Sequence, residues 1–135
     1  MPCLHIQIAG ARDDALATRT ASVAAELTGS LLGKDRALTA VVVEFIEPTH
    51  WFIAGAALAI DAPRSYHWQV SITDETNTRA EKGRYIAAVH AAMGELLGAV
   101  AEHSYVHVAD RRASAYGYGG RTQEWRYQQP ARQST

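Results

Sequence analysis

The sequence repeats itself at an offset of 65 residues, and this internal repeat restricts the possible folds more than any other feature. At this offset the segment from about residue 12 to residue 55 aligns without a gap. The matching residues are Arg19 with Arg84, Gly29 with Gly94, Leu31-Leu32-Gly33 with Leu96-Leu97-Gly98, Val41 with Val106, Val43 with Val108, and Gly55 with Gly120. Each identity is weak because these residue types are common, so the evidence is their coincidence at one offset. The chain therefore contains two copies of one unit.

Each copy is predicted to fold as a strand, a helix and a second strand. Apolar and polar residues alternate from Leu4 to Ile8, and apolar residues recur at helical spacing from Leu16 to Leu31, with Asp13 or Asp14 as the N-cap. The segment from Leu38 to Ile46 is β-branched and apolar enough to predict a strand buried on both faces. The second copy gives a strand at 68–72, a polar turn at 73–78, a helix at 86–96 and a strand at 105–108.

Two such units predict an α+β fold with a single structural domain. A helix that joins parallel strands requires a crossover of this length, so duplicated βαβ units form one four-stranded mixed sheet with both helices on one face. Residues 1–62 form the first repeat and residues 63–125 the second. Residues 126–135 are a polar C-terminal tail, which we expect to be mobile or to wrap a neighbouring subunit.

The face of the sheet without helices is predicted to be apolar and to bind further copies of the chain. The apolar run from Trp51 to Ile60 supports this, because it is too apolar for an exposed loop and directly follows a strand. It extends the strand across a subunit boundary or, alternatively, forms an internal β-hairpin that closes the core. We expect a homo-oligomer.

Composition excludes several classes of protein. Thirteen basic and fourteen acidic residues give a formal net charge of -1, which leaves no excess charge for binding nucleic acid or an anionic membrane. A single cysteine, Cys3, excludes an intrachain disulfide and a zinc ribbon. No apolar window reaches the roughly 18 residues of a spanning helix, and no signal peptide is evident. A cytoplasmic location is the expectation.

Pro2 is the most informative residue for chemistry. If Met1 is removed, Pro2 becomes an N-terminal secondary amine, and burial in an apolar site disfavours its protonated form. A neutral amine near pH 7 can take a proton from carbon beside a carbonyl group and return it elsewhere, which is general acid–base catalysis by one group. Many chains begin with Met-Pro, so Pro2 is evidence for this chemistry only together with the residues around it.

That context resembles the tautomerase superfamily, which includes 4-oxalocrotonate tautomerase, the macrophage migration inhibitory factor group and cis-3-chloroacrylic acid dehalogenase. Pro2 runs directly into a strand, and aromatic–glycine turns follow the second strand of each copy, at 50–55 and 115–120. The resemblance extends from Pro2 to about Trp125 and includes the βαβ duplication. It implies a tautomerase-like fold, a homotrimer with pseudo-sixfold symmetry, and a small carboxylate as substrate, with no cofactor.

The resemblance also implies roles for individual residues. Pro2 matches the catalytic proline, and Arg12 matches an arginine that holds a substrate carboxylate. Trp51 stands where the family has an active-site phenylalanine, which would keep the proline amine in an apolar setting.

Other positions depart from the family pattern. A second arginine of 4-oxalocrotonate tautomerase is Val42 here, which makes the same mode of dicarboxylate binding doubtful. His107 replaces a tyrosine of the two-repeat dehalogenase, and Ala115 replaces its water-activating glutamate. Asp74 and Asn77 stand in the turn where the dehalogenases and malonate semialdehyde decarboxylase carry paired arginines. These differences disfavour hydrolytic dehalogenation.

The remaining candidates complete the predicted pocket. His107 and Tyr116 would shape and polarise it, and Arg111 and Arg112 would supply the missing anion contact, although a solvated loop pair is the simpler interpretation. His103 and His107 lack further clustered ligands, so no metal site is predicted.

Three functions are compatible with these residues. The first is a cofactor-independent tautomerase or isomerase of a small 2-oxo or enol acid, with Pro2 as general acid and base. The second is a decarboxylase or hydratase of a short unsaturated or 3-oxo acid that uses the same proline. The third is a non-catalytic oligomeric binding module of ferredoxin-like topology, which would retain Met1.

Overall fold

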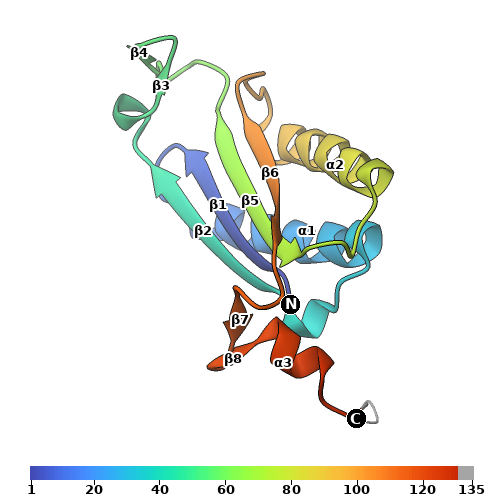
Figure 1. Ribbon diagram of the computed structural model, residues 1–135. Helices are drawn as coiled ribbons and strands as arrows, with labels where there is room; N and C mark the ends of the chain where they lie inside the picture. The colour runs from blue at the N-terminus through green and yellow to red at the C-terminus, as the bar shows by residue number, and fades with distance from the viewer. Residues whose placement is uncertain (131–135) are drawn as a thin grey trace.

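A computed structural model, described here for residues 1–130, shows a four-stranded mixed sheet with two long helices on one face (Figure 1). The main elements are β1 (Cys3–Ala9), α1 (Asp14–Leu32), β2 (Ala40–Ile46), β5 (Tyr66–Thr73), α2 (Arg79–Leu97) and β6 (Tyr105–Arg111). The strand order is β2-β1-β5-β6. β1 is parallel to β2, β5 is parallel to β6, and the two central strands β1 and β5 are antiparallel. The predicted α+β fold is confirmed.

Several smaller elements complete the fold. They are the 3-10 turns η1 (Arg36–Leu38) and η2 (Pro48–His50), the hairpin of β3 (Phe52–Ile53) with β4 (Ala56–Ala57), the hairpin of β7 (Gly117–Tyr118) with β8 (Arg121–Thr122), and α3 (Gln123–Tyr127). The two hairpins match residue by residue at the 65-residue offset. Their turns also match, because Ala54 and Gly55 have φ values of 53° and 79° while Gly119 and Gly120 have 60° and 78°. The repeat seen in the sequence is therefore also present in the structure.

Both long helices begin with side-chain caps. The Asp13 carboxylate accepts a hydrogen bond from the Leu16 amide at 3.0 Å, and Thr78 forms a capping box with Glu81. α1 ends at Gly33, whose left-handed conformation (φ 68°) turns the chain back toward the sheet. The two caps lie 65 residues apart and set the same helix start in each repeat.

The core lies between the sheet and the two helices. Its buried apolar residues include Leu4, Ile6, Ile8, Trp68, Val70, Ile72, Val89 and Met93. A buried polar chain crosses it, because the Trp68 indole donates to the Tyr85 hydroxyl at 3.0 Å and this hydroxyl is bonded to the Thr28 hydroxyl at 2.9 Å. These bonds hold both helices to β5.

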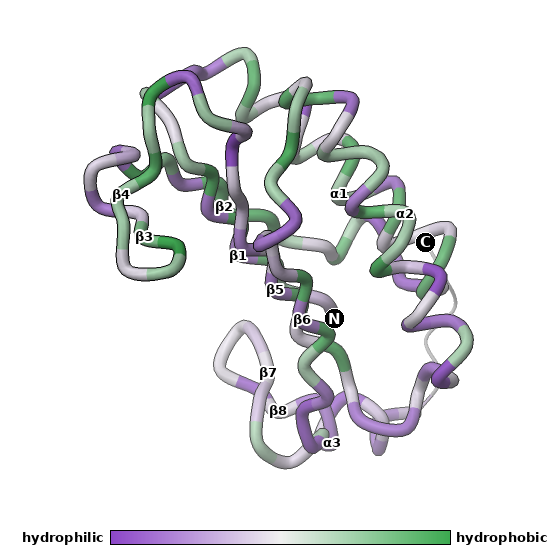
Figure 2. The backbone as a smooth tube through the Cα atoms, turned by 90° about the horizontal axis from the view of Figure 1, so that it is seen from above, coloured by the Kyte–Doolittle hydropathy of each residue, from purple (hydrophilic) through white to green (hydrophobic). Residues whose placement is uncertain are grey.

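The face of the sheet opposite the helices is not the apolar surface that the sequence analysis predicts. His5, Gln7, Glu44, Gln69 and His107 alternate with the core residues on its strands, and polar and apolar positions are mixed along them (Figure 2). The prediction that β2 is buried on both faces is also wrong. β2 is an edge strand with helices on one side only, so its alternate residues are partly or largely exposed, as for Val42 at 55%.

The apolar run from Trp51 to Ile60 forms the β3–β4 hairpin, which extends beyond the sheet (Figure 1). Phe52 is 62% exposed and Ile60 is 96% exposed, so this hairpin does not close the core. At the other end of the chain, α3 includes Arg126 and Tyr127, and the expected boundary after residue 125 falls inside this helix. The expectation for the rest of the tail falls on residues 131–135, outside the described part. No helix within residues 1–130 is long and apolar enough to cross a membrane.

Replacing Tyr85 by phenylalanine tests the polar chain in the core. The change leaves the Trp68 indole N–H and the Thr28 hydroxyl without their shared partner, and we expect the free energy of unfolding to fall by about 2 kcal/mol. Tyr105→Phe is the matched control, because Tyr105 is half exposed on the uncovered face. Urea denaturation of both variants measures the difference, and equal stabilities would show that the chain contributes nothing.

Candidate active site

Pro2 lies at the end of the sheet where β1 begins and where β5 and β6 end. Its side chain is buried, and its carbonyl accepts a hydrogen bond from the Ala40 amide at 3.3 Å. Because β1 and β5 are antiparallel, with Cys3 opposite Ser71, the start of β1 lies beside the end of β5. β6 ends here too, and the Asp74 amide donates to the Arg111 carbonyl at 2.8 Å. The β7–β8 hairpin and α3 lie at this same end, close to the N-terminus (Figure 1).

The structure separates the predicted site residues into three groups. Arg111, Arg112 and Tyr116 follow or end β6 and therefore share the end of the sheet with Pro2. Arg111 is the last residue of β6, so it is not in the predicted loop.

Arg12 and Trp51 lie at the opposite end of the sheet. Both come after strands that run away from Pro2, and a seven-residue strand such as β1 separates its ends by about 20 Å. The Arg12 guanidinium is exposed and pairs with the Asp14 carboxylate at 3.1 Å. Within one chain, neither Arg12 nor Trp51 reaches Pro2. Tyr116 is the counterpart of Trp51 at the 65-residue offset, so it occupies the equivalent position beside Pro2.

His107 lies on the uncovered face of the sheet, away from both ends. Its ring stacks against Tyr105 with centroids 6.1 Å apart. His67, opposite Tyr105 in the register, has a lowered pKa because it is partly buried and because His107 is near. Within residues 1–130, no group of three His, Cys, Asp or Glu side chains is placed to hold a metal ion.

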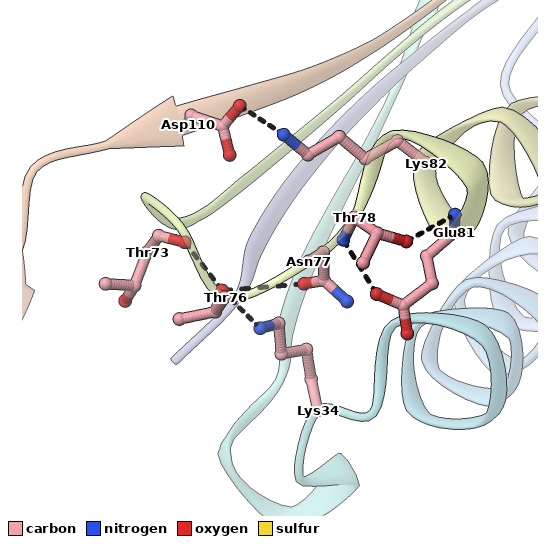
Figure 3. Close-up of polar contacts among 8 residues, drawn as sticks. All are labelled: Lys34, Thr73, Thr76, Asn77, Thr78, Glu81, Lys82 and Asp110. Atoms are coloured by element: carbon pink, nitrogen blue, oxygen red, sulfur yellow. Dashed lines mark hydrogen bonds and ion pairs between the residues drawn. The ribbon is translucent and has the colours of Figure 1, made fainter.

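Lys34 is a residue of this site that the sequence analysis missed. It follows Gly33 at the end of α1, and its ammonium donates to the Thr76 hydroxyl at 2.8 Å, as Figure 3 shows. Thr76 in turn donates to the Thr73 carbonyl at 2.6 Å. Burial lowers the pKa of Lys34, although Glu81 and Asp110 act in the opposite direction. Lys34 therefore presents a partly desolvated charge whose direct partner is a neutral hydroxyl group.

The chain's other lysine lies nearby and is neutralised. The Lys82 ammonium donates to the Asp110 carboxylate at 2.6 Å (Figure 3). Asn77 holds the turn between them, because its amide donates to the Leu32 carbonyl at 2.9 Å. This hydrogen bond ties the end of α1 to the turn that precedes α2.

Two tyrosines converge on one threonine at the end of β5. The Thr73 hydroxyl is 2.7 Å from the Tyr116 hydroxyl and 3.0 Å from the Tyr127 hydroxyl. Burial raises the pKa of Tyr116, the bond to Thr73 lowers it, and the neighbouring Tyr127 raises it further. Both hydroxyl groups therefore meet at the end of β5 through Thr73.

Positive charges at this end of the sheet affect the amino terminus. The pKa of the Met1 amine is lowered, first by burial and then by the positive charges of Lys34 and Arg126. An amine at this position is therefore held toward its neutral form, and an anion here is attracted. Topology could have indicated Lys34, since α1 returns the chain to the start of β1. Nothing in the sequence pattern separated Arg126 from the tail.

No family model and no curated protein matches the sequence. Solved structures do match its fold. The structure of Pt0534 inactivated by 2-oxo-3-pentynoate is 16% identical with a TM-score of 0.80, over 92% of this chain and 98% of that chain. A fused 4-OT wild-type symmetric trimer is 17% identical with a TM-score of 0.78, over 90% and 96% of the two chains.

A member of the cis-3-chloroacrylic acid dehalogenase family, N1, is 16% identical with a TM-score of 0.71, over 93% of this chain and 92% of that chain. These similarities extend over almost the whole chain at low identity. The chain therefore has the fold of the tautomerase superfamily, and the predicted resemblance is confirmed at the level of the fold.

Replacing Thr73 by valine tests how the β7–β8 hairpin and α3 are fixed beside Pro2. Valine removes the partner of both tyrosine hydroxyls, and we expect this segment to open more readily. Amide exchange at Gln123 and Glu124, which donate to Tyr116 and Ala113, should accelerate about tenfold. Thr73→Ser should restore protection, and the Leu16 amide, at the other end of the sheet, is the internal control. Unchanged exchange in Thr73→Val would contradict this anchoring role.

Proposed function

We propose that this protein is a cofactor-independent tautomerase that acts on a small 2-oxo or enol carboxylic acid, with Pro2 as the general acid and base. The observation that carries this proposal is the setting of the amino terminus, where partial burial and the positive charges of Lys34 and Arg126 lower the pKa of the amine. The shared fold with tautomerase-superfamily structures supports it.

The mechanism begins with removal of Met1. While Met1 is attached, the Pro2 nitrogen is part of a peptide bond and cannot act as a base. Once freed, the secondary amine lies one residue along the chain from the position of the Met1 amine, and burial of Pro2 together with the same two cations disfavours its protonation. The neutral amine takes a proton from the enol oxygen or from carbon next to the carbonyl group. It then returns that proton to the other position, so the substrate is isomerised without net gain or loss of atoms.

Lys34 and Arg126 hold the substrate carboxylate in this mechanism. Both positive charges act on the amino terminus, and their direct partners are neutral groups, a hydroxyl for Lys34 and a carbonyl for Arg126. They supply the anion contact that Arg12 of the same chain cannot reach. Tyr116 and Tyr127 line the approach and position Thr73.

We further propose that the chain forms a homo-oligomer, in line with the trimers found among its structural neighbours. Large apolar side chains remain exposed on the single chain, including Val42, Phe52 and Ile60. Arg12 and Trp51 approach Pro2 only if they come from another subunit. We place the enzyme in the cytoplasm and expect no nucleic-acid or membrane partner, in keeping with its near-zero net charge.

Pro2→Ala tests the catalytic role directly. We expect ketonisation of 2-hydroxymuconate or phenylenolpyruvate to slow at least about a hundredfold, because a primary amine of different geometry and pKa replaces the proline. Intact-mass spectrometry of the wild type should show loss of Met1. Retention of Met1 in an active preparation would overturn the mechanism. Release of carbon dioxide or addition of water to the product would instead assign the decarboxylase or hydratase reaction.

Lys34→Gln tests the anion contact and the electrostatics together. Loss of this cation should raise KM about tenfold, because one charge-assisted contact to the carboxylate disappears. It should also raise the pKa of the Pro2 amine, so the rising limb of the pH–rate profile moves to higher pH. Lys82→Gln is the matched control, because Lys82 pairs with Asp110. If both variants behave alike, Lys34 has no special role.

A further inference from the structure

A cavity lies between the β7–β8 hairpin and α3. It has a volume of about 520 Å³ and is lined by Tyr118, Gly119, Arg121, Trp125, Arg126, Gln129 and Pro130. Two of these side chains are cations and none is acidic. The proposed mechanism needs only Arg126 from this set.

The two arginines of the cavity are arranged around aromatic rings. The Arg121 guanidinium lies 4.2 Å from the centre of the Trp125 ring, and that of Arg126 lies 3.7 Å from the Tyr118 ring. Arg126 donates to the Tyr118 carbonyl at 2.9 Å, while its buried Nε has no hydrogen-bond partner. Within residues 1–130 neither arginine pairs with a carboxylate. Such groups match a ligand that offers a negative charge and a flat ring.

The corresponding positions of the first repeat do not carry these side chains. At the 65-residue offset, Tyr118 corresponds to Ile53, Arg121 to Ala56, Trp125 to Ile60, and Arg126 to Asp61. The same hairpin is built at the other end of the sheet, where no helix equivalent to α3 lies between β4 and β5. The aromatic and cationic groups are therefore specific to one end of the molecule.

We propose that the cavity between the β7–β8 hairpin and α3 is a binding site for a small planar anion, such as an aromatic carboxylate, distinct from the proline site and sharing Arg126 with it. An anion bound there engages Arg126 and withdraws it from the substrate carboxylate. Occupation of the site therefore inhibits the reaction. This inhibitory effect rests on the proposed function, whereas binding does not.

Binding is tested with benzoate by following the three tryptophan indole N–H signals in nuclear magnetic resonance spectra of the full chain. We expect the Trp125 signal to shift with a Kd of about 1 mM, since benzoate has few atoms and one charge. The Trp68 signal should stay in place, because that indole is buried against Tyr85. Benzamide lacks the charge and cyclohexanecarboxylate lacks the flat ring, so both should bind about tenfold more weakly.

Variants separate this site from the proline site. Arg121→Gln should weaken benzoate binding about tenfold, and Arg19→Gln, an exposed arginine elsewhere, should not. Pro2→Ala and Lys34→Gln should leave the Trp125 shift unchanged, so the binding result stands even if the tautomerase mechanism fails. In the active enzyme, benzoate should inhibit with the same half-maximal concentration, and Arg121→Gln should relieve that inhibition. Absence of a Trp125 shift, or equal binding by Arg121→Gln, would overturn the proposal.

Discussion

The antiparallel pairing of β1 with β5 is the constraint on which the rest of the molecule depends. Each repeat alone contains two parallel strands and one helix, and only this pairing joins the repeats into one sheet. It also places the start of each repeat beside the end of the other. Pro2, which opens the first repeat, therefore lies at the same end of the sheet as residues that close the second, such as Tyr116 and Arg126.

The sequence predicted the fold because its signals are local and occur twice. Alternation, helical spacing and capping residues define six elements, and the 65-residue offset assigns them to two equivalent units. Such local signals do not predict which residues come together in the proposed active site. Arg12 and Trp51 come from the same repeat as Pro2, yet the strands between them carry them to the far end of the sheet. Lys34 is only found by following α1 back toward β1.

The character of the uncovered face shows a second limit of pattern reasoning. A run such as that from Ala40 to Ile46 contains enough apolar residues for a strand buried on both faces. Burial, however, depends on where the strand lies in the sheet and on which faces the helices cover. β2 is an edge strand, so only Val41, Val43 and Phe45 pack against the core. On the same open face, the adjoining strand β1 presents His5 and Gln7, and β6 at the opposite edge presents His107.

The two ends of the sheet share one architecture but differ in chemistry. The first strand of the second repeat, β5, begins inside the chain at Tyr66, so the second repeat offers no terminal amine. At the 65-residue offset Lys34 corresponds to Ala99, and Arg126 corresponds to Asp61. The cations that lower the pKa of the amino terminus are thus missing from the other end. Duplication therefore supplied two ends of similar backbone structure, and side-chain divergence leaves one end per chain with both cations beside the amino terminus.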